Sequence, residues 1–341
     1  MALDRKVRVG FIGAGSHSTN SIYPCLNHAV HGGAFLRDEP IGELVAVCDL
    51  DGEKAERHAR VFGFEKAYSN HEEMLAKEDL DCVFVVMHPE LQYPLAKAVM
   101  TAGAHVFIEK PPTETLEQAR DLQAISKQTG KFCMVGFMKR FSQVYEQIKT
   151  WMALPEFGEP SAYEARFTYS GYPTDRYDFL NGFSCHHLDL VRFFMGDVRS
   201  VFAEHVARDE RHHSYAAVLR FANDAVGLLH TNCLEQYNCA AERVCVTGFE
   251  SVAVSDGWQD ARCYLGGQRQ PLCWSPNTPL TAALMNAELK GFAAEVRHFI
   301  ESARNEQRPQ SNISDGVECL RLEVAIKRSA EEGRRIDIAD I

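Results

Sequence analysis

The first third of the chain alternates short apolar runs with amphipathic segments, and this alternation is the strongest constraint on its fold. Such a pattern is typical of βαβ units, in which helices connect the strands of a parallel sheet. The nearly continuous apolar run at 80–87 indicates a strand covered on both faces. Further strands are expected at 7–12, 43–48, 105–108 and 133–137, with helices at 52–62, 91–101 and 113–127. The sequence therefore predicts a doubly wound α/β sheet here.

After about residue 139 the pattern changes to β-rich segments separated by polar turns, which predicts a mostly antiparallel sheet. The expected strands are 162–169, 201–206, 216–221, 225–231, 243–246 and 336–338, and the expected helices are 185–195, 291–304 and 315–331. At roughly 150 residues per domain, a chain of 341 residues is long enough for two domains. We expect an α/β domain at 1–136 and an α+β domain on a large open sheet at 137–341.

Composition excludes several classes of protein. The chain has 36 basic and 47 acidic residues, a net charge of −11, which argues against a nucleic-acid or anionic-membrane partner. Its 11 cysteines form no CxxC pair, so neither a disulfide framework nor a zinc ribbon is implied. No apolar run approaches the length of a membrane span. We expect a soluble, cytoplasmic protein with no metal site.

The motif Gly-Ala-Gly-Ser-His-Ser at 13–18 follows a predicted strand and opens a predicted helix. This is the context of the dinucleotide-binding fingerprint, in which glycines let the backbone approach a pyrophosphate at the helix N-terminus. An ordinary strand–helix turn is the alternative, since the third glycine is replaced by serine. The candidate cofactor-binding residues in the motif are Gly13, Gly15, Ser16, His17 and Ser18.

Asp49 ends the second predicted strand and is the candidate ribose ligand. A carboxylate there can accept both ribose hydroxyls and would repel a 2′-phosphate, so NAD is favoured over NADP. Asp49 lies 34 residues after Gly15, where about 20 is usual. We interpret the excess as a loop insertion at 26–40, of unknown role.

The run AGAHVFIEKPP contains Glu109-Lys110-Pro111-Pro112, lies between GAGSHS and VGFMKRF, and resembles the Gfo/Idh/MocA oxidoreductases. The similarity extends through DGEKAERHARVFGF and SDGVECLRLEVAIKRSAEEGRRI, so it covers most of the chain. The resemblance implies an N-terminal Rossmann domain that binds NAD(P), and a C-terminal domain for substrate binding and oligomerisation. It further implies hydride transfer on sugars, sugar derivatives or cyclitols.

Lys110 follows a buried strand, at the sheet edge where ligands bind in α/β folds. There its ammonium could hold a substrate hydroxyl and favour its alkoxide form; a solvated surface lysine is the alternative. The resemblance implies a cis peptide bond between Lys110 and Pro111. It also places Glu109 and His88 at the cofactor, although a solvent-facing loop histidine is an equal interpretation for His88.

The segment FSCHHLDL at 183–190 is similar to the family's D-x-G-x-H-x-x-D-L motif. The resemblance assigns the proton acceptor or relay to His186, a role that suits an imidazole; a structural histidine at a helix start is the alternative. The family's aspartate is replaced by Gly182, and its glycine by Ser184. Asp178 or Asn181 could supply the missing polar group, or it could be absent.

A few more polar residues are candidates for contact with substrate, and each could equally be a surface or interface residue. Asp189, one turn after His186, is expected to be structural or to orient a neighbour. The candidates near the predicted pocket are Lys139, Arg140, Tyr172, Arg176 and Tyr177, besides Asn181.

The resulting hypothesis is an NAD-dependent dehydrogenase in which Lys110 holds the reacting hydroxyl and His186 relays its proton. One alternative is a glycoside hydrolase that retains NAD through a redox cycle. Another is a ligand sensor or regulator that uses the fold without catalysis. By resemblance, a homodimer or homotetramer is expected to form through the C-terminal sheet.

Overall fold

The computed structural model describes residues 5–26, 40–169, 179–235, 241–276 and 285–341. The chain divides into two compact units, Met1–Met138 with Ala283–Val317, and Lys139–Ala282 with Glu318–Ile341. The first division lies two residues beyond the predicted boundary at 136. The return of 283–317 to the first unit was not predicted, because the sequence pattern marks a helix there but not its partner.

The first unit is built on a six-stranded sheet in the order β3-β2-β1-β4-β5-β6, and every strand pair is parallel. This order is that of a doubly wound Rossmann sheet, as predicted. The order in which the strands are added reverses between β1 and β4: β2 and β3 lie on one side of β1, and β4, β5 and β6 lie on the other. The strands are β1 (Val7–Ile12), β2 (Gly42–Cys48), β3 (Lys66–Tyr68), β4 (Cys82–Val85), β5 (His105–Ile108) and β6 (Cys133–Val135).

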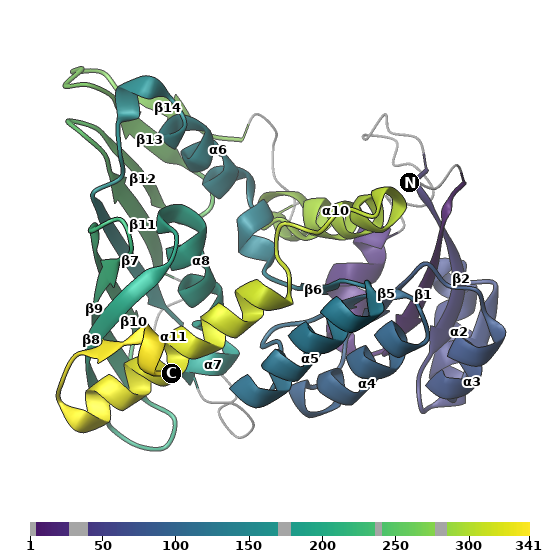
Figure 1. The fold of residues 1–341 in the computed structure, drawn as a ribbon. Helices are drawn as coiled ribbons and strands as arrows, with labels where there is room; N and C mark the ends of the chain where they lie inside the picture. Colours follow the sequence, from purple (N-terminus) through teal and green to yellow (C-terminus); the bar gives the residue numbers. More distant parts are fainter. Residues whose placement is uncertain (1–4, 27–39, 170–178, 236–240, 277–284) are drawn as a thin grey trace. The chain divides into compact units, whose positions relative to one another are not determined.

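The helices of this unit begin and end at residues that cap them. In α2 (Gly52–Phe62) the Asp51 side chain accepts the Lys54 N–H, and Gly63 ends the helix with a left-handed φ of 83°. Thr115 caps α5 (Leu116–Thr129) in the same way. The helix α4 (Pro89–Thr101) packs beside α5 (Figure 1). The short β3 and α3 (His71–Lys77) were not predicted, because their polar residues give no clear period.

The helix α10 (Phe292–Asn305) belongs to the first unit, and aromatic packing explains why. Its Phe299 ring is fully buried, 4.8 Å from the Phe84 ring of β4 and 5.7 Å from the Phe107 ring of β5. The chain beyond α10 bonds to β6, where the Val135 N–H donates to Ser311 O over 3.0 Å. These contacts hold α10, a helix from late in the chain, against the six-stranded parallel sheet of the first unit.

The second unit contains a nine-stranded sheet in the order β14-β13-β12-β11-β7-β10-β9-β8-β15. Only the pair β7–β10 is parallel among its described strands, so the predicted, mostly antiparallel sheet is confirmed. Its strands are β7 (Ala162–Thr168), β8 (Val198–Ala207), β9 (His213–Phe221), β10 (Val226–Asn232), β11 (Ala241–Thr247), β12 (Val252–Asp256), β13 (Ala261–Tyr264), β14 (Leu272–Trp274) and β15 (Ile336–Asp337).

Helices cover one face of this sheet. Figure 1 shows α6 (Gln143–Met152) and α8 (Cys185–Met195) on the same side of it, with α6 packed on β12 and β13 and α8 on β7. The division between the two units falls within the long helix α11 (Ile313–Glu332). Side chains on the other face remain partly exposed, among them Val218 and Leu228 at 40% and 54%. No helix in the described part of the chain is long and apolar enough to cross a membrane.

Candidate functional site

The turn after β1 has the geometry that a phosphate-binding loop needs. Gly13 adopts φ = +110°, and a Cβ there would clash with the carbonyl oxygen of Val86, so only glycine fits. The Gly13 N–H donates to Cys48 O over 2.8 Å, which fixes the turn to β2. A Cβ built on Gly15 would meet nothing within 4 Å, so the backbone at this glycine faces open space.

The helix that follows places the rest of the motif in two environments. Ser16 and His17 are exposed in the first helical turn, beside Gly15, whereas Ser18 is fully buried. A π-helical segment, η1 (Ser18–Ile22), continues the helix. Ser18 therefore occupies the packing position of the third glycine in the fingerprint, and Ser16 and His17 occupy the ligand side. The predicted insertion at 26–40 lies almost wholly outside the described residues.

Asp49 is tied directly to the glycine turn. Its Oδ2 accepts the Ala14 N–H over 2.8 Å, and its Oδ1 accepts the Asp51 N–H over 3.0 Å. These bonds hold the carboxylate at the carboxyl end of β2, where ligands bind in open α/β sheets. The open backbone at Gly15, the exposed first helical turn and this fixed carboxylate together fit the adenosine and diphosphate of NAD.

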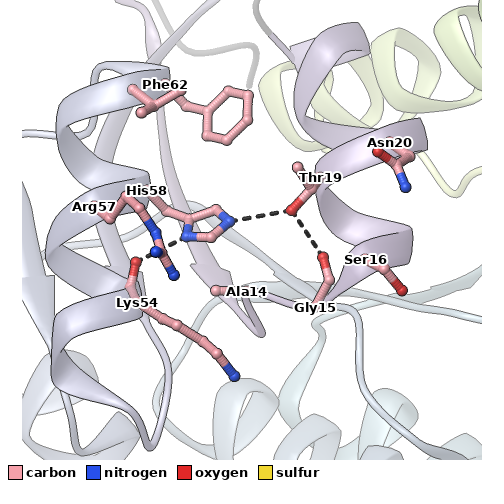
Figure 2. A pocket seen from close by; sticks show the side chains of 10 residues that line it. Ala14, Gly15, Ser16, Thr19, Asn20, Lys54, Arg57, His58 and Phe62 are labelled. Atoms are coloured by element: carbon pink, nitrogen blue, oxygen red, sulfur yellow. Dashed lines mark hydrogen bonds between the residues drawn. The ribbon is translucent and has the colours of Figure 1, made fainter.

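A pocket of about 430 Å³ lies beside this turn, between the helix after β1 and α2 (Figure 2). His58 joins the two helices, because its Nε2 lies 3.1 Å from Thr19 Oγ1 and its Nδ1 2.8 Å from Lys54 O. The residues lining the pocket are Ala14, Gly15, Ser16, Thr19, Asn20, Lys54, Arg57, His58, Val61 and Phe62. Most of these residues were not predicted to line a site, because His58 and Phe62 fit the apolar period of α2 and read as core residues. The basic Lys54 and Arg57 were the sequence signal that could have indicated the pocket.

Glu109 is joined to the glycine motif by an ion pair. Its carboxylate is buried after β5, and its Oε1 lies 2.9 Å from His17 Nε2. The charge of Glu109 raises the pKa of His17, against the opposing effect of burial. Burial alone would raise the pKa of Glu109, but His17 and Lys110 outweigh it and the pKa lies below its ordinary value. Two predicted cofactor residues 92 positions apart are thus in contact.

Lys110 is half-buried directly after Glu109. Its backbone N–H donates to Glu109 Oε2 over 3.1 Å, and its peptide bond to Pro111 is cis, as the resemblance implied. The Pro111 carbonyl accepts the Gln92 side-chain amide over 2.8 Å. The backbone on both sides of Lys110 is therefore anchored at the carboxyl edge of the sheet. His88, exposed at the start of α4, remains a predicted cofactor contact.

In the second unit, His186 is the second residue of α8 and is 8% exposed. Ser184, which replaces the family's glycine, is buried and hydrogen-bonded to Thr231 of β10. Gly182 and Asn181 lie in the short helix α7 (Phe179–Gly182), and Asn181 is half-buried. The other predicted candidates in this loop, Tyr172, Arg176, Tyr177 and Asp178, lie outside the described residues.

Arg140 and Asp189 form a buried ion pair. The Arg140 Nε and Nη2 atoms lie 2.7 and 2.6 Å from the two Asp189 carboxylate oxygens, and both residues are at most 5% exposed. This bidentate pair joins the segment after β6 to α8. Asp189, expected to be structural or to orient a neighbour, binds the Arg140 guanidinium, so the group predicted for substrate has a protein carboxylate as a partner.

Lys139, another predicted pocket residue, belongs to a buried polar cluster around Glu242. The Glu242 carboxylate accepts hydrogen bonds from Lys139 Nζ, Tyr145 OH and Trp258 Nε1, and His187 Nε2 lies 3.3 Å away. Burial raises the pKa of a carboxyl, but Lys139 and His187 outweigh it and hold the pKa of Glu242 far below its ordinary value. Burial and then the charge of Lys139 lower the pKa of His187, against the opposing charge of Glu242. No group of three His, Cys, Asp or Glu side chains suited to a metal occurs among the described residues.

Two family models match this chain. Residues 7–137 match the family model for the oxidoreductase family with an NAD-binding Rossmann fold. Residues 157–338 match the model for the C-terminal alpha/beta domain of the same family. Together the two models span most of the chain.

Whole-length relatives share low sequence identity with this chain. A myo-inositol 2-dehydrogenase from Thermotoga maritima is 22% identical over 311 residues, covering 87% of this chain and 92% of that protein. A D-apiose dehydrogenase from Paraburkholderia graminis is 24% identical and covers 99% and 91% of the two chains.

Solved structures show the same fold. A levoglucosan dehydrogenase in complex with NADH and levoglucosan superposes with a TM-score of 0.85 at 17% identity, covering 98% of this chain and 100% of that one. An NAD-binding oxidoreductase from Klebsiella pneumoniae gives a TM-score of 0.84 at 21% identity, covering 98% and 99%. The two matching family models, the parallel six-stranded sheet and the fixed Asp49 lead to one conclusion: the chain belongs to the Gfo/Idh/MocA oxidoreductase family and carries its NAD-binding Rossmann domain.

Proposed function

We propose that this protein is an NAD-dependent dehydrogenase of a polyhydroxylated small molecule, a sugar, sugar derivative or cyclitol. The observation that carries the proposal is the anchored Glu109-Lys110-Pro111 segment at the carboxyl edge of a Rossmann sheet. A lysine at this edge presents an ammonium where ligands of open α/β sheets bind. Relatives named as inositol and apiose dehydrogenases support the substrate class.

In this proposal the cofactor supplies the hydride chemistry, and the chain supplies orientation and charge. Residues 15–17 hold the diphosphate with backbone N–H groups, because the Gly13 and Ala14 N–H groups are bonded within the turn, and Asp49 accepts the ribose hydroxyls. Lys110 donates a hydrogen bond to the reacting hydroxyl, which lowers the cost of its alkoxide form. His186 accepts the hydroxyl proton directly or through water, in the role that the family resemblance assigns to it. Glu109, His88 and Asn181 are further proposed contacts.

A substrate screen tests the proposed activity. Sugars, inositols and their keto forms are incubated with NAD and NADP in parallel, and absorbance of the reduced cofactor is followed. We expect net NADH formation with a member of the panel and much weaker activity with NADP, because the Asp49 carboxylate repels a 2′-phosphate.

The same screen separates the competing functions. Sugar release from glycosides without net NADH would identify the redox-cycling hydrolase instead. Tight NAD binding with no turnover across the panel would identify a sensor. A strong preference for NADP would overturn the role given to Asp49.

We also propose that the uncovered face of the second sheet pairs subunits into a homodimer or homotetramer. In the strand register Phe202, Val218 and Leu228 lie in one row across β8, β9 and β10, and Val218 and Leu228 are among its exposed members. A partly exposed apolar row on a sheet is a typical association surface.

Substitution of this row tests the assembly. We expect the wild-type protein to elute as a multiple of the 38.3-kDa chain in light-scattering chromatography, and Leu228→Asp to elute as the monomer, since a buried charge opposes pairing. Phe249→Asp, at an exposed turn residue, serves as the matched control and should leave the mass unchanged. A monomeric wild-type chain would contradict the assembly.

A further inference from the structure

The His17–Glu109 ion pair crosses the part of the first unit where a dinucleotide binds. His17 follows β1 and Glu109 follows β5, and β4 lies between these two strands in the sheet. The pair therefore spans the point between β1 and β4 where the strand order reverses, and ligands of open α/β sheets bind in this crevice. His17 also lies in the first turn of the helix, whose N–H groups are anion donors.

The carboxylates at this edge favour a cation near the diphosphate, in addition to the Lys54 and Arg57 side chains that line the adjacent pocket. Glu109 and Asp49 place two carboxylates at the carboxyl ends of β5 and β2. A diphosphate brought to the same edge would meet these like charges, which weakens binding. The His17 side chain is 45% exposed although its Nε2 is bonded to Glu109, so part of the ring faces outward from the pair. A protonated ring neutralises Glu109 and can donate a second hydrogen bond.

We propose that His17, held by Glu109, is a cationic group of the cofactor site, so that binding of the dinucleotide diphosphate is coupled to protonation of this imidazole. The inference rests on the proposed function, because it concerns the same cofactor site. It goes beyond the glycine motif, in which only the backbone of His17 has a role. It makes cofactor affinity, rather than chemistry alone, dependent on pH.

The groups around His17 set the direction of this dependence. Glu109 raises the pKa of His17 and Lys110, which also follows β5, lowers it; the third neighbour is the uncharged Phe292 ring of α10, with ring centres 5.8 Å apart. The net result is a pKa above the ordinary imidazole value, so the cation persists to higher pH than it would on a free imidazole. As pH rises through this raised pKa, the charge is lost and affinity for the diphosphate falls.

The test is equilibrium binding of NADH, followed by its fluorescence from about pH 6 to about pH 9, the range in which an imidazole loses its proton. For the wild-type protein we expect the Kd to rise about tenfold across this range, the loss of one charge-assisted hydrogen bond. His17→Gln should bind weakly at every pH with little slope. Glu109→Gln should move the midpoint to lower pH, a shift that a purely structural role would not produce.

Two further variants keep the result decisive. His17→Lys carries a charge that persists beyond pH 9 and should retain tight binding there. His212→Gln, at an exposed histidine of the β8–β9 hairpin, is the matched control and should behave as wild type. An undiminished slope in His17→Gln overturns the coupling and leaves the proposed function intact. Absence of NADH binding to the wild-type protein at any pH overturns both.

Discussion

Lys110→Ala is expected to lower kcat by about 10²–10⁴-fold, the contribution of a positioned group that takes part in proton transfer. At about 1.4 kcal/mol per tenfold, this loss corresponds to roughly 3–5.5 kcal/mol of transition-state stabilisation. The expectation rests on how the residue is held. Its N–H is bonded to the buried Glu109 carboxylate, and the following carbonyl to Gln92, so the ammonium starts from a fixed backbone.

The measurement uses the substrate found in the screen, with kcat and KM determined separately and NADH binding measured by fluorescence. Lys97→Ala removes an exposed lysine of α4 paired with Asp121, and should leave all three quantities close to wild type. We expect Lys110→Ala to retain cofactor binding while kcat falls. Near wild-type turnover with intact NADH binding would remove Lys110 from the chemistry.

Lys139→Met is expected to destabilise the second unit by about 3–5 kcal/mol at neutral pH, because it leaves the Glu242 carboxylate buried without its cation. Lys139 and Glu242 are both at most 5% exposed. The Tyr145 and Trp258 bonds remain in the variant, but they carry no positive charge. Removing both charges, in the double variant Lys139→Met with Glu242→Gln, should recover much of the loss.

The loss of stability in Lys139→Met should depend on pH in a definite direction. In the wild-type protein the lowered pKa of Glu242 stabilises the fold above the ordinary carboxyl range, and that stability is lost as pH falls. Without Lys139, burial raises the pKa of Glu242, so the defect is largest when this carboxyl is ionised. It should shrink as pH falls, since Glu242 then takes up a proton and no longer places an unpaired charge in the interior.

Urea unfolding, followed by tryptophan fluorescence, tests the predicted loss of stability in Lys139→Met. The three tryptophans, Trp151, Trp258 and Trp274, all lie in the second unit, so their emission reports on that unit rather than on the nucleotide-binding one. Arg199→Met, at an exposed cation of β8 paired with Asp224 in the same unit, provides the control and should leave the transition nearly unchanged. A Lys139→Met transition that coincides with wild type would contradict the role of the cluster.

Local sequence signals predicted several elements of both units well. The strand at 105–108 and the helices at 52–62 and 185–195 have the predicted bounds, because period, caps and flanking glycines act within a few residues. The glycine turn and Asp49 were predicted for the same reason. The short β3 and α3 were missed, since their apolar residues are too few to show a period.

The sequence by itself determined that a dinucleotide fold precedes a mostly antiparallel sheet, and that Gly13, Asp49 and Lys110 follow strands at its ligand edge. Only the tertiary structure decided what each charged residue does. Lys139 is paired with Glu242, 103 positions away, and His17 with Glu109, 92 positions away. Backbone geometry and capping depend on neighbours along the chain, whereas the partner of a buried charge is fixed by packing between distant segments, which no local pattern records.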